Sequence, residues 1–172
     1  MAISDIKVRG MDVTWNGQDL GSTSGGVEVS IEVQSTDIIT DQNGTSPVDA
    51  IQTGVAVTLS LTLIELNTAN YNQMIATPTG GSASGSDATV YGHGSSKNFT
   101  SMLAMAQTLR LRPTGNSTEA EDITFWKAVP VVDSIGFAPD SANSMAVTFR
   151  IFKDSSKAAA VDLYAIGDPT GV

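Results

Sequence analysis

Residues 27–34 have the sequence VEVSIEVQ, in which valine or isoleucine occupies every second position. A period of two places successive side chains on opposite faces of a β-strand. The stretch therefore predicts a half-buried strand whose aliphatic side chains all face the core. Its polar side chains are expected to face the other way, and these belong to Glu28, Ser30, Glu32 and Gln34.

Residues 54–64, GVAVTLSLTLI, repeat this alternation, with Thr58, Ser60 and Thr62 on the face away from the core. At about 3.4 Å per residue this second strand is roughly 34 Å long, which exceeds the usual strand length. The intervening residues 35–53 are polar and rich in turn-forming side chains. We expect them to form a loop or an extended hairpin, because they hold too little apolar surface to pack on their own chain.

The rest of the sequence favours short strands joined by turns. Asn16-Gly17 lies between two short segments and is a strong signal for a type I′ hairpin turn. Residues 67–77 combine an N-capping side chain with an apolar stripe at helical spacing, which predicts a helix. Residues 80–96 are rich in Gly and Ser and are predicted to be a mobile insertion. Further strands are predicted over residues 102–111, 123–132 with an interruption near Pro130, 145–152 and 161–166.

Together these elements predict a mainly β fold. The expected architecture is an antiparallel β-sandwich or barrel with one flanking α-helix and long loop or hairpin excursions. The 172 residues include 19 Ser, 19 Thr and 16 Gly, a composition that suits strands and turns. Because no internal repeat or domain boundary is evident, we expect a single domain over residues 1–172.

Charge and composition exclude several classes of function. The chain has 9 Lys and Arg against 18 Asp and Glu, so its net charge of -9 disfavours specific binding to nucleic acid phosphates. It has no Cys, which excludes disulfides and thiolate metal sites. No apolar run approaches the roughly 18 residues that span a bilayer, so we expect no membrane partner.

Acidic residues and the one His offer weak candidates for a metal site or catalysis. Residues 37–49 loosely resemble a calcium loop, but the ligand spacing fails and turn chemistry explains the same residues. His93 lies between two glycines, which predicts an exposed loop side chain. Glu119, Glu121 and Asp122 precede a strand, where a solvated loop is a simpler interpretation than a catalytic pair. We therefore expect no enzymatic activity, no cofactor and no resident metal.

Two arginines alternate along a predicted strand. Arg110 and Arg112 are expected either to pair with acidic side chains of a neighbouring subunit or to cover an exposed face.

The two predicted long strands have one aliphatic and one polar face, and they are longer than a compact domain of this size needs. Their edges must be paired or otherwise protected from unwanted pairing. Copies of the chain that pair side by side into a closed ring would explain the strand length, the polar face and the excursion over residues 35–53.

The order of these elements resembles that of the tail tube (major tail) proteins of tailed bacteriophages. The matching stretches are the hairpin VTWNGQDLG at residues 13–21, the strand at 27–34, DQNGTSPVDAI at 41–51 leading to Gly54, ELNTAN at 65–70, and IGDP at 166–169. The most specific of these is the DQNG passage through Pro47, Val48 and Asp49 into the second long strand.

The resemblance implies rings, with six copies each, that stack into a hollow tube with the sheets joined around the lumen. Such a tube encloses a tape-measure protein, meets a tail terminator and conducts DNA without binding it specifically. The expected location is the virion tail, with assembly in the host cytoplasm. We expect the lumen to be lined by Glu28, Ser30, Glu32, Gln34, Thr58, Ser60 and Thr62. Contacts between subunits are expected at Asp41, Asn43, Gly44, Pro47 and Asp49.

Two other functions fit the same fold. A monomeric β-sandwich that acts as an adhesin or binding module would present a row of exposed aromatic side chains. Another virion part, such as a tail terminator or capsid decoration protein, would share the setting without open-ended stacking.

Overall fold

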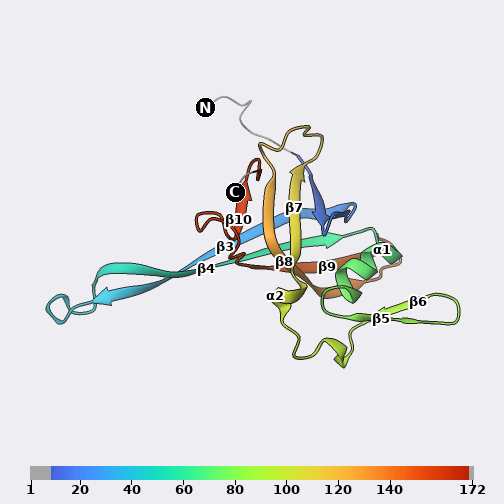
Figure 1. Ribbon diagram of the computed structural model, residues 1–172, viewed down its shortest axis with the longest axis horizontal. Coiled ribbons are helices and arrows are strands. Elements are labelled where there is room, and N and C mark those ends of the chain that lie inside the picture. The colour runs from blue at the N-terminus through green and yellow to red at the C-terminus, as the bar shows by residue number, and fades with distance from the viewer. Residues whose placement is uncertain (1–8, 171–172) are drawn as a thin grey trace.

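The computed structural model describes residues 9–170 and is mainly β, with antiparallel pairing throughout the described sheets (Figure 1). The large sheet contains β1 (Met11–Trp15), β2 (Gln18–Asp19), β3 (Thr23–Ile39), β4 (Pro47–Leu63), β7 (Gln107–Pro113), β8 (Ile123–Gly136), β9 (Ser144–Phe152) and β10 (Tyr164–Ile166). A separate two-stranded sheet contains β5 (Gly81–Ser84) and β6 (Thr89–Gly92). The short helices are α1 (Thr68–Tyr71) and α2 (Met102–Met105), with a π-helical turn η3 (Asn72–Ala76) after α1.

The strands of the large sheet follow the order β2-β1-β7-β8-β9-β4-β3, and β10 also pairs with β8. β8 belongs to both halves of this sheet. Its first part pairs with β7 and β10, and its second part pairs with β9. The strands on the two sides of β8 run in steeply different directions, so the sheet folds over on itself as a sandwich (Figure 1).

The core fills the space between the two halves. Trp15 from β1 and Phe149 from β9 are fully buried, and their ring centroids lie 6.5 Å apart. The Trp15 indole N–H also donates a hydrogen bond of 3.0 Å to the Ala128 carbonyl oxygen of β8. This bond satisfies the one polar group of the largest core side chain, as burial requires.

Two local predictions are confirmed. The β1–β2 turn holds Asn16 at φ 52° and Gly17 at φ 76°, the left-handed pair that a type I′ turn requires. The predicted helix forms over residues 68–76, and the Asn67 side chain accepts a 2.9 Å hydrogen bond from the Asn70 N–H. Asn70 is itself buried and donates to the Leu20 carbonyl at 3.0 Å, which fixes the helix against the first hairpin.

Residues 35–53 form an extended hairpin rather than a loop. β3 and β4 pair along their full length, and the distal part projects from the body (Figure 1). We call residues 31–56 the arm. The expectation that every aliphatic side chain of β3 faces the core is wrong for Ile31 and Val33, which are 48% and 58% exposed. The alternation continues, but the strand extends beyond the body that could cover it.

Three further predictions require correction. Residues 80–96 were predicted to be a mobile insertion, and they contain the β5–β6 hairpin, which was not predicted. Residues 102–105 form α2 rather than the start of a strand, since Met, Leu and Ala favour helix. β8 runs through Pro130 without interruption. Proline is tolerated there because the second part of β8 pairs on one side with β9 and needs no N–H on its other edge.

Candidate functional site: the polar sheet face and the arm

The polar side chains of β3 and β4 lie side by side on the outer face of the sheet. Glu28 pairs with Ser60 and Ser30 pairs with Thr58 in the strand register. These four side chains are exposed and Thr62 is half-buried. Glu32 and Gln34 are also exposed but belong to the arm, beyond the last residue of β4 that pairs with β9.

Neighbouring strands extend this surface with residues that the sequence alone did not reveal. Thr148 and Arg150 of β9 pair with Ser60 and Thr58, and Thr148 donates a 2.6 Å hydrogen bond to Asp133 at a bulge in β8. We call this set the polar sheet face: Glu28, Ser30, Thr58, Ser60, Thr62, Asp133, Thr148 and Arg150. The sequence could not identify its β9 and β8 members, because strands far apart in the chain supply them.

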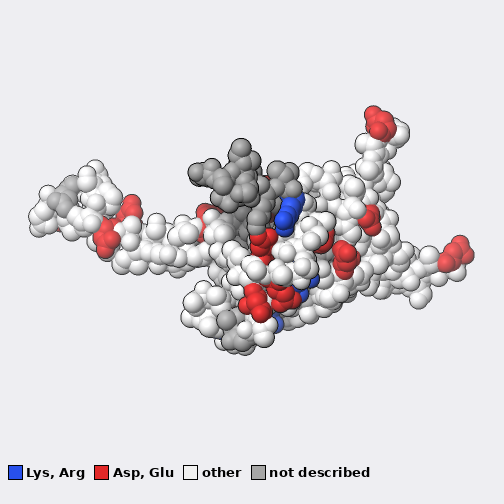
Figure 2. Space-filling model, turned by 90° about the horizontal axis from the view of Figure 1, so that it is seen from above, with Lys and Arg blue, Asp and Glu red and all other residues white. Residues whose placement is uncertain are grey.

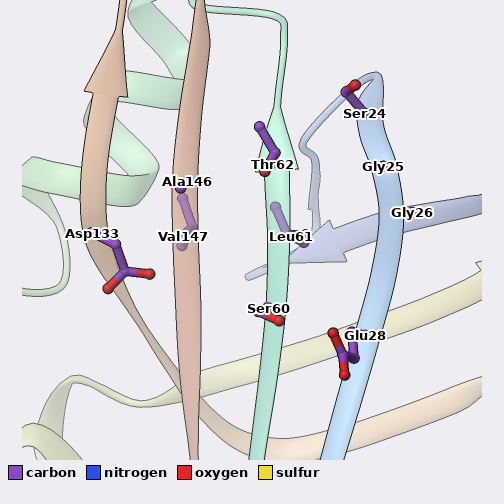
Figure 3. Close-up of a pocket in the computed structure, with 10 residues that line it drawn as sticks. All are labelled: Ser24, Gly25, Gly26, Glu28, Ser60, Leu61, Thr62, Asp133, Ala146 and Val147. Carbon is purple, nitrogen blue, oxygen red and sulfur yellow. The ribbon is translucent and has the colours of Figure 1, made fainter.

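A shallow groove of about 230 Å³ lies within the polar sheet face. Figure 3 shows Glu28 and Asp133 on its two sides with Ser60 between them. Small hydroxyl side chains thus separate two carboxylates, and Arg150 on the neighbouring row is the one cation of this set. The face is solvent-exposed and mildly acidic, because it carries two carboxylates and one guanidinium group.

The residues predicted to contact other subunits lie at the end of the arm. Asp41 belongs to a 3₁₀ turn at its tip, and Gly44 follows at φ 65°. Pro47 and Asp49 begin β4, and both are exposed. The backbone of Asn43 lies in the same turn, and its side chain is outside the described part of the structure.

The arm is acidic and partly apolar. Residues 31–56 contain four acidic residues and no Lys or Arg. In the view of Figure 2 red side chains mark the outer arm, and no blue appears on it. Ile39 and Ile51 are each 56% exposed and Val48 is 48% exposed. Exposing these apolar side chains to water does not stabilise an isolated monomer. Grouped exposure of this kind is typical of a surface that contacts another protein.

The sheet also has unpaired edges. Within residues 9–170, β3 pairs with β4 alone, and β4 pairs with β9 only over Thr58–Leu63. The distal half of β4 therefore presents a second free edge along the arm. Long free edges of this kind readily accept another strand.

Arg110 and Arg112 meet neither of the two expectations stated for them, because they pair with acidic residues of their own chain. The Arg110 Nε donates to Asp122 Oδ2 at 2.7 Å, and the Arg112 Nη2 donates to the same oxygen at 2.9 Å. Glu119 bridges both guanidinium groups from the exposed side. Asp122 is fully buried, so the interpretation of these residues as a solvated loop is wrong for Asp122, and the cluster anchors the start of β8 to β7.

Burial of Asp122 would raise the pKa of its carboxyl, but the hydrogen bonds from Arg112 and Arg110 outweigh burial and lower it. A carboxyl with a lowered pKa stabilises the fold above its unfolded-state pKa, and this stabilisation is lost as the pH falls through the folded-state pKa. The cluster therefore predicts acid sensitivity below about pH 4.

We predict that Asp122→Asn lowers the free energy of unfolding by about 3 kcal/mol at neutral pH, because it breaks a buried ion pair. Glu119→Gln is the matched control, since its side chain is 42% exposed and contacts the same two arginines. Its expected cost is below about 1 kcal/mol. Urea unfolding at pH 7 and at pH 3 measures both changes, and the difference between the variants should shrink at the lower pH. Equal costs for the two substitutions would contradict this assignment.

The remaining candidate from the sequence, His93, does not belong to the polar sheet face. His93 is exposed, and its Nε2 lies 3.1 Å from the Thr79 hydroxyl. Over residues 9–170 no group of three or more His, Asp or Glu side chains is arranged to hold a metal ion. No helix of the described chain has the length and hydropathy to cross a membrane.

No protein-family model matches the chain, and no curated protein matches it either. The polar sheet face and the arm are therefore interpreted from their geometry and chemistry.

Proposed function

We propose that the protein is a structural virion protein whose copies assemble into stacked rings, forming a phage tail tube that conducts DNA. The arm is the observation that carries this proposal. It extends two paired strands beyond the body and exposes Ile31, Val33 and Ile51 together with two unpaired edges. Contact with further copies would bury those side chains and pair those edges.

The polar sheet face supports a role as the lumen wall. The strands β3, β4, β9 and the second part of β8 form a four-stranded segment with its aliphatic side inward and its polar side exposed. Joining such segments edge to edge around a ring would give a continuous inner wall of hydroxyl and carboxylate groups. That wall would repel phosphates at close range and offer them few hydrogen-bonding cations.

The partners of this proposal follow from the resemblance to tail tube proteins. They are further copies of the chain, a tape-measure protein, a tail terminator and DNA in transit. The proposal includes no catalysis and no cofactor.

The alternative of a monomeric binding module has less support. Of the ten aromatic residues, all of which lie in the described part of the chain, Phe99 and Phe137 are the exposed ones. They lie on different loops, so they form no row against which a ligand could stack.

The test of the proposal is self-association of the purified protein. We expect rings or tubes to appear above a threshold concentration, because nucleated assembly needs several weak contacts at once. Light scattering over a concentration series and negative-stain electron microscopy measure this. Discs of a single ring would favour the tail terminator reading, and a species that stays monomeric at high concentration would contradict the proposal.

A further inference from the structure

The molecule carries a second projecting hairpin at the end opposite the arm. It consists of β5 and β6, and across its turn the Gly85 N–H donates a 2.9 Å hydrogen bond to the Ala88 carbonyl oxygen. The arm and this hairpin extend in opposite directions along the longest axis of the molecule (Figure 1). We call residues 81–92 the short hairpin.

The short hairpin is incomplete as a sheet. Within residues 9–170 β5 and β6 pair only with each other, so both outer edges of the hairpin are unpaired. Its base contacts η3, where the Gly80 N–H donates to the Ile75 carbonyl oxygen at 2.6 Å. Val90, in the middle of β6, is 58% exposed. A two-stranded hairpin is marginally stable in water, so a third strand would stabilise it.

The unpaired strand edges of the described chain fall into two groups. Edge-to-edge joining of the four-stranded segments uses the outer strands of each segment, which are β3 and the second part of β8. The remaining unpaired edges of four or more residues are the β4 edge before Thr58 and the two edges of the short hairpin. β2 and β10 are only two and three residues long, so they offer little to pair with.

The direction of the strands relates this second group to contacts between rings. Strands tilt by about 35–45° from the axis of a closed barrel, so in the proposed ring they run more along the tube axis than around it. β3 and β4 follow the longest axis of the molecule, with the arm at one end and the short hairpin at the other (Figure 1). The two projections therefore reach towards the rings on opposite sides.

We infer that the short hairpin of one copy adds to the free β4 edge of a copy in the next ring, with β6 as the added strand. This inference rests on the proposed function, because it names the surfaces through which rings stack. β6 contains Val90 and Tyr91, whereas β5 holds only Gly, Ser and Ala. Aromatic and β-branched side chains strengthen cross-strand pairs. The target is the outer part of β4, where Val48 and Ile51 are exposed.

The two edges are compatible in length and charge. The outer part of β4, residues 47–52, is long enough for the four residues of β6, and Asp49 is its one charged residue. β6 has no charged side chain, and Asp87 lies in the turn beyond the paired strands. Lys97 follows the short hairpin, has no ion pair among the described residues and offers Asp49 an opposite charge. The two surfaces differ from each other, so the contact is heterologous and repeats without closing.

Removing the short hairpin should stop assembly at single rings. Gly81 and Gly92 are register partners, so an Asn-Gly turn in place of residues 82–91 closes the shortened loop. None of the deleted residues belongs to the hydrophobic core. We expect a folded variant that forms rings but no tubes, because the edges that join copies within a ring are intact. Circular dichroism establishes folding, and negative-stain electron microscopy distinguishes rings from tubes.

The matched control for the deletion is Ser86→Asn with Asp87→Gly. It introduces the same turn residues but keeps both strands of the short hairpin. We expect this control to form tubes like the unaltered chain, because the added strand β6 is still present.

Disulfide trapping tests the same contact in the full chain, which has no Cys. The probe is Val90→Cys with Ile51→Cys under mild oxidation by oxidised glutathione, and both side chains are exposed. Moving the second Cys through residues 48–52 covers the possible registers. β6 and the arm lie at opposite ends of one copy, so each disulfide joins two copies and we expect a ladder of multimers (Figure 1). The matched control is Val90→Cys with Thr58→Cys, where β4 pairs with β9, and it should give no ladder.

The outcomes separate this contact from the proposed function. Tubes from the deletion variant, or tubes without a ladder at any of the tested positions, overturn the contact and leave the tube intact. A folded monomer from the deletion, where the unaltered chain forms tubes, overturns the assignment to ring stacking. Dimers from Val90→Cys alone show that the hairpins meet each other, which also overturns it. A ladder without tubes supports the contact and contradicts the tube, and a monomer that gives neither product overturns both.

Discussion

Replacing residues 35–53 with an Asn-Gly turn is expected to give a folded protein that no longer polymerises. The cut is placed where Gln34 and Gly54 are register partners, so a two-residue type I′ turn can close the shortened hairpin. The deleted residues are all outside the hydrophobic core. The thermal midpoint should therefore change little, while assembly is lost completely, because the deletion removes the distal apolar side chains and the distal part of both free edges of the arm.

A nested variant separates the tip of the arm from its strands. Replacing residues 40–46 with the same Asn-Gly turn removes Asp41, Asn43 and Gly44 but keeps most of both strands. We expect this variant also to fail in assembly, since contacts between subunits are predicted at the tip. Circular dichroism establishes folding, and electron microscopy with light scattering establishes assembly. Normal tubes from the longer deletion would refute the role of the arm.

The second large effect concerns the polar sheet face together with Glu32, which continues the row of Glu28 along β3 onto the arm. Glu28→Lys with Glu32→Lys is expected to leave assembly intact but to slow DNA delivery at least about tenfold. Both side chains are exposed, so the cost in stability should stay within about 0.5 kcal/mol for each. Lysines on the lumen wall would form phosphate contacts that repeat in every ring, and such contacts strengthen strongly at low salt.

Slower delivery could have two causes, attraction of DNA phosphates by the new lysines or loss of repulsion by the glutamates. A neutral variant and a change of salt concentration distinguish them. Glu28→Gln with Glu32→Gln removes the carboxylates without adding cations, and it should slow delivery much less. The field of exposed charges decays within about 8 Å at physiological salt, so a lumen wall of these side chains would act on DNA only at close range. Raising the salt should restore delivery by the lysine variant. Delivery at the normal rate by assembled particles with both lysines would exclude this face as the lumen.

Local features of the fold could be predicted from the sequence because their causes lie within a few residues. The alternation over 27–34 and 54–64 gave the two faces of the long hairpin, and the register pairs Glu28 with Ser60 as those faces require. Asn16-Gly17 and Asn67 likewise act through their own backbone neighbours. These local patterns were enough for the fold class and for five of the eight residues of the polar sheet face.

The extent of burial was decided by the tertiary structure. Val29 and Ile31 look equivalent in the sequence, yet Val29 packs against the core and Ile31 is 48% exposed. Periodicity specifies which way a side chain points, whereas coverage depends on where the opposing sheet ends. The sequence therefore could not show that the core stops at the base of the arm.

Partners that are distant in sequence were also fixed only by the three-dimensional arrangement. Pairing of β4 with β9 brings Arg150 beside Thr58, and the bulge in β8 brings Asp133 to Thr148. Composition and alternation established on their own that this is an acidic β protein in which one sheet face is polar and solvent-exposed. Which side chains share that face was determined only by the packing of strands from distant parts of the chain. Strand pairing depends on contacts between residues far apart in the sequence, and no local pattern encodes these contacts.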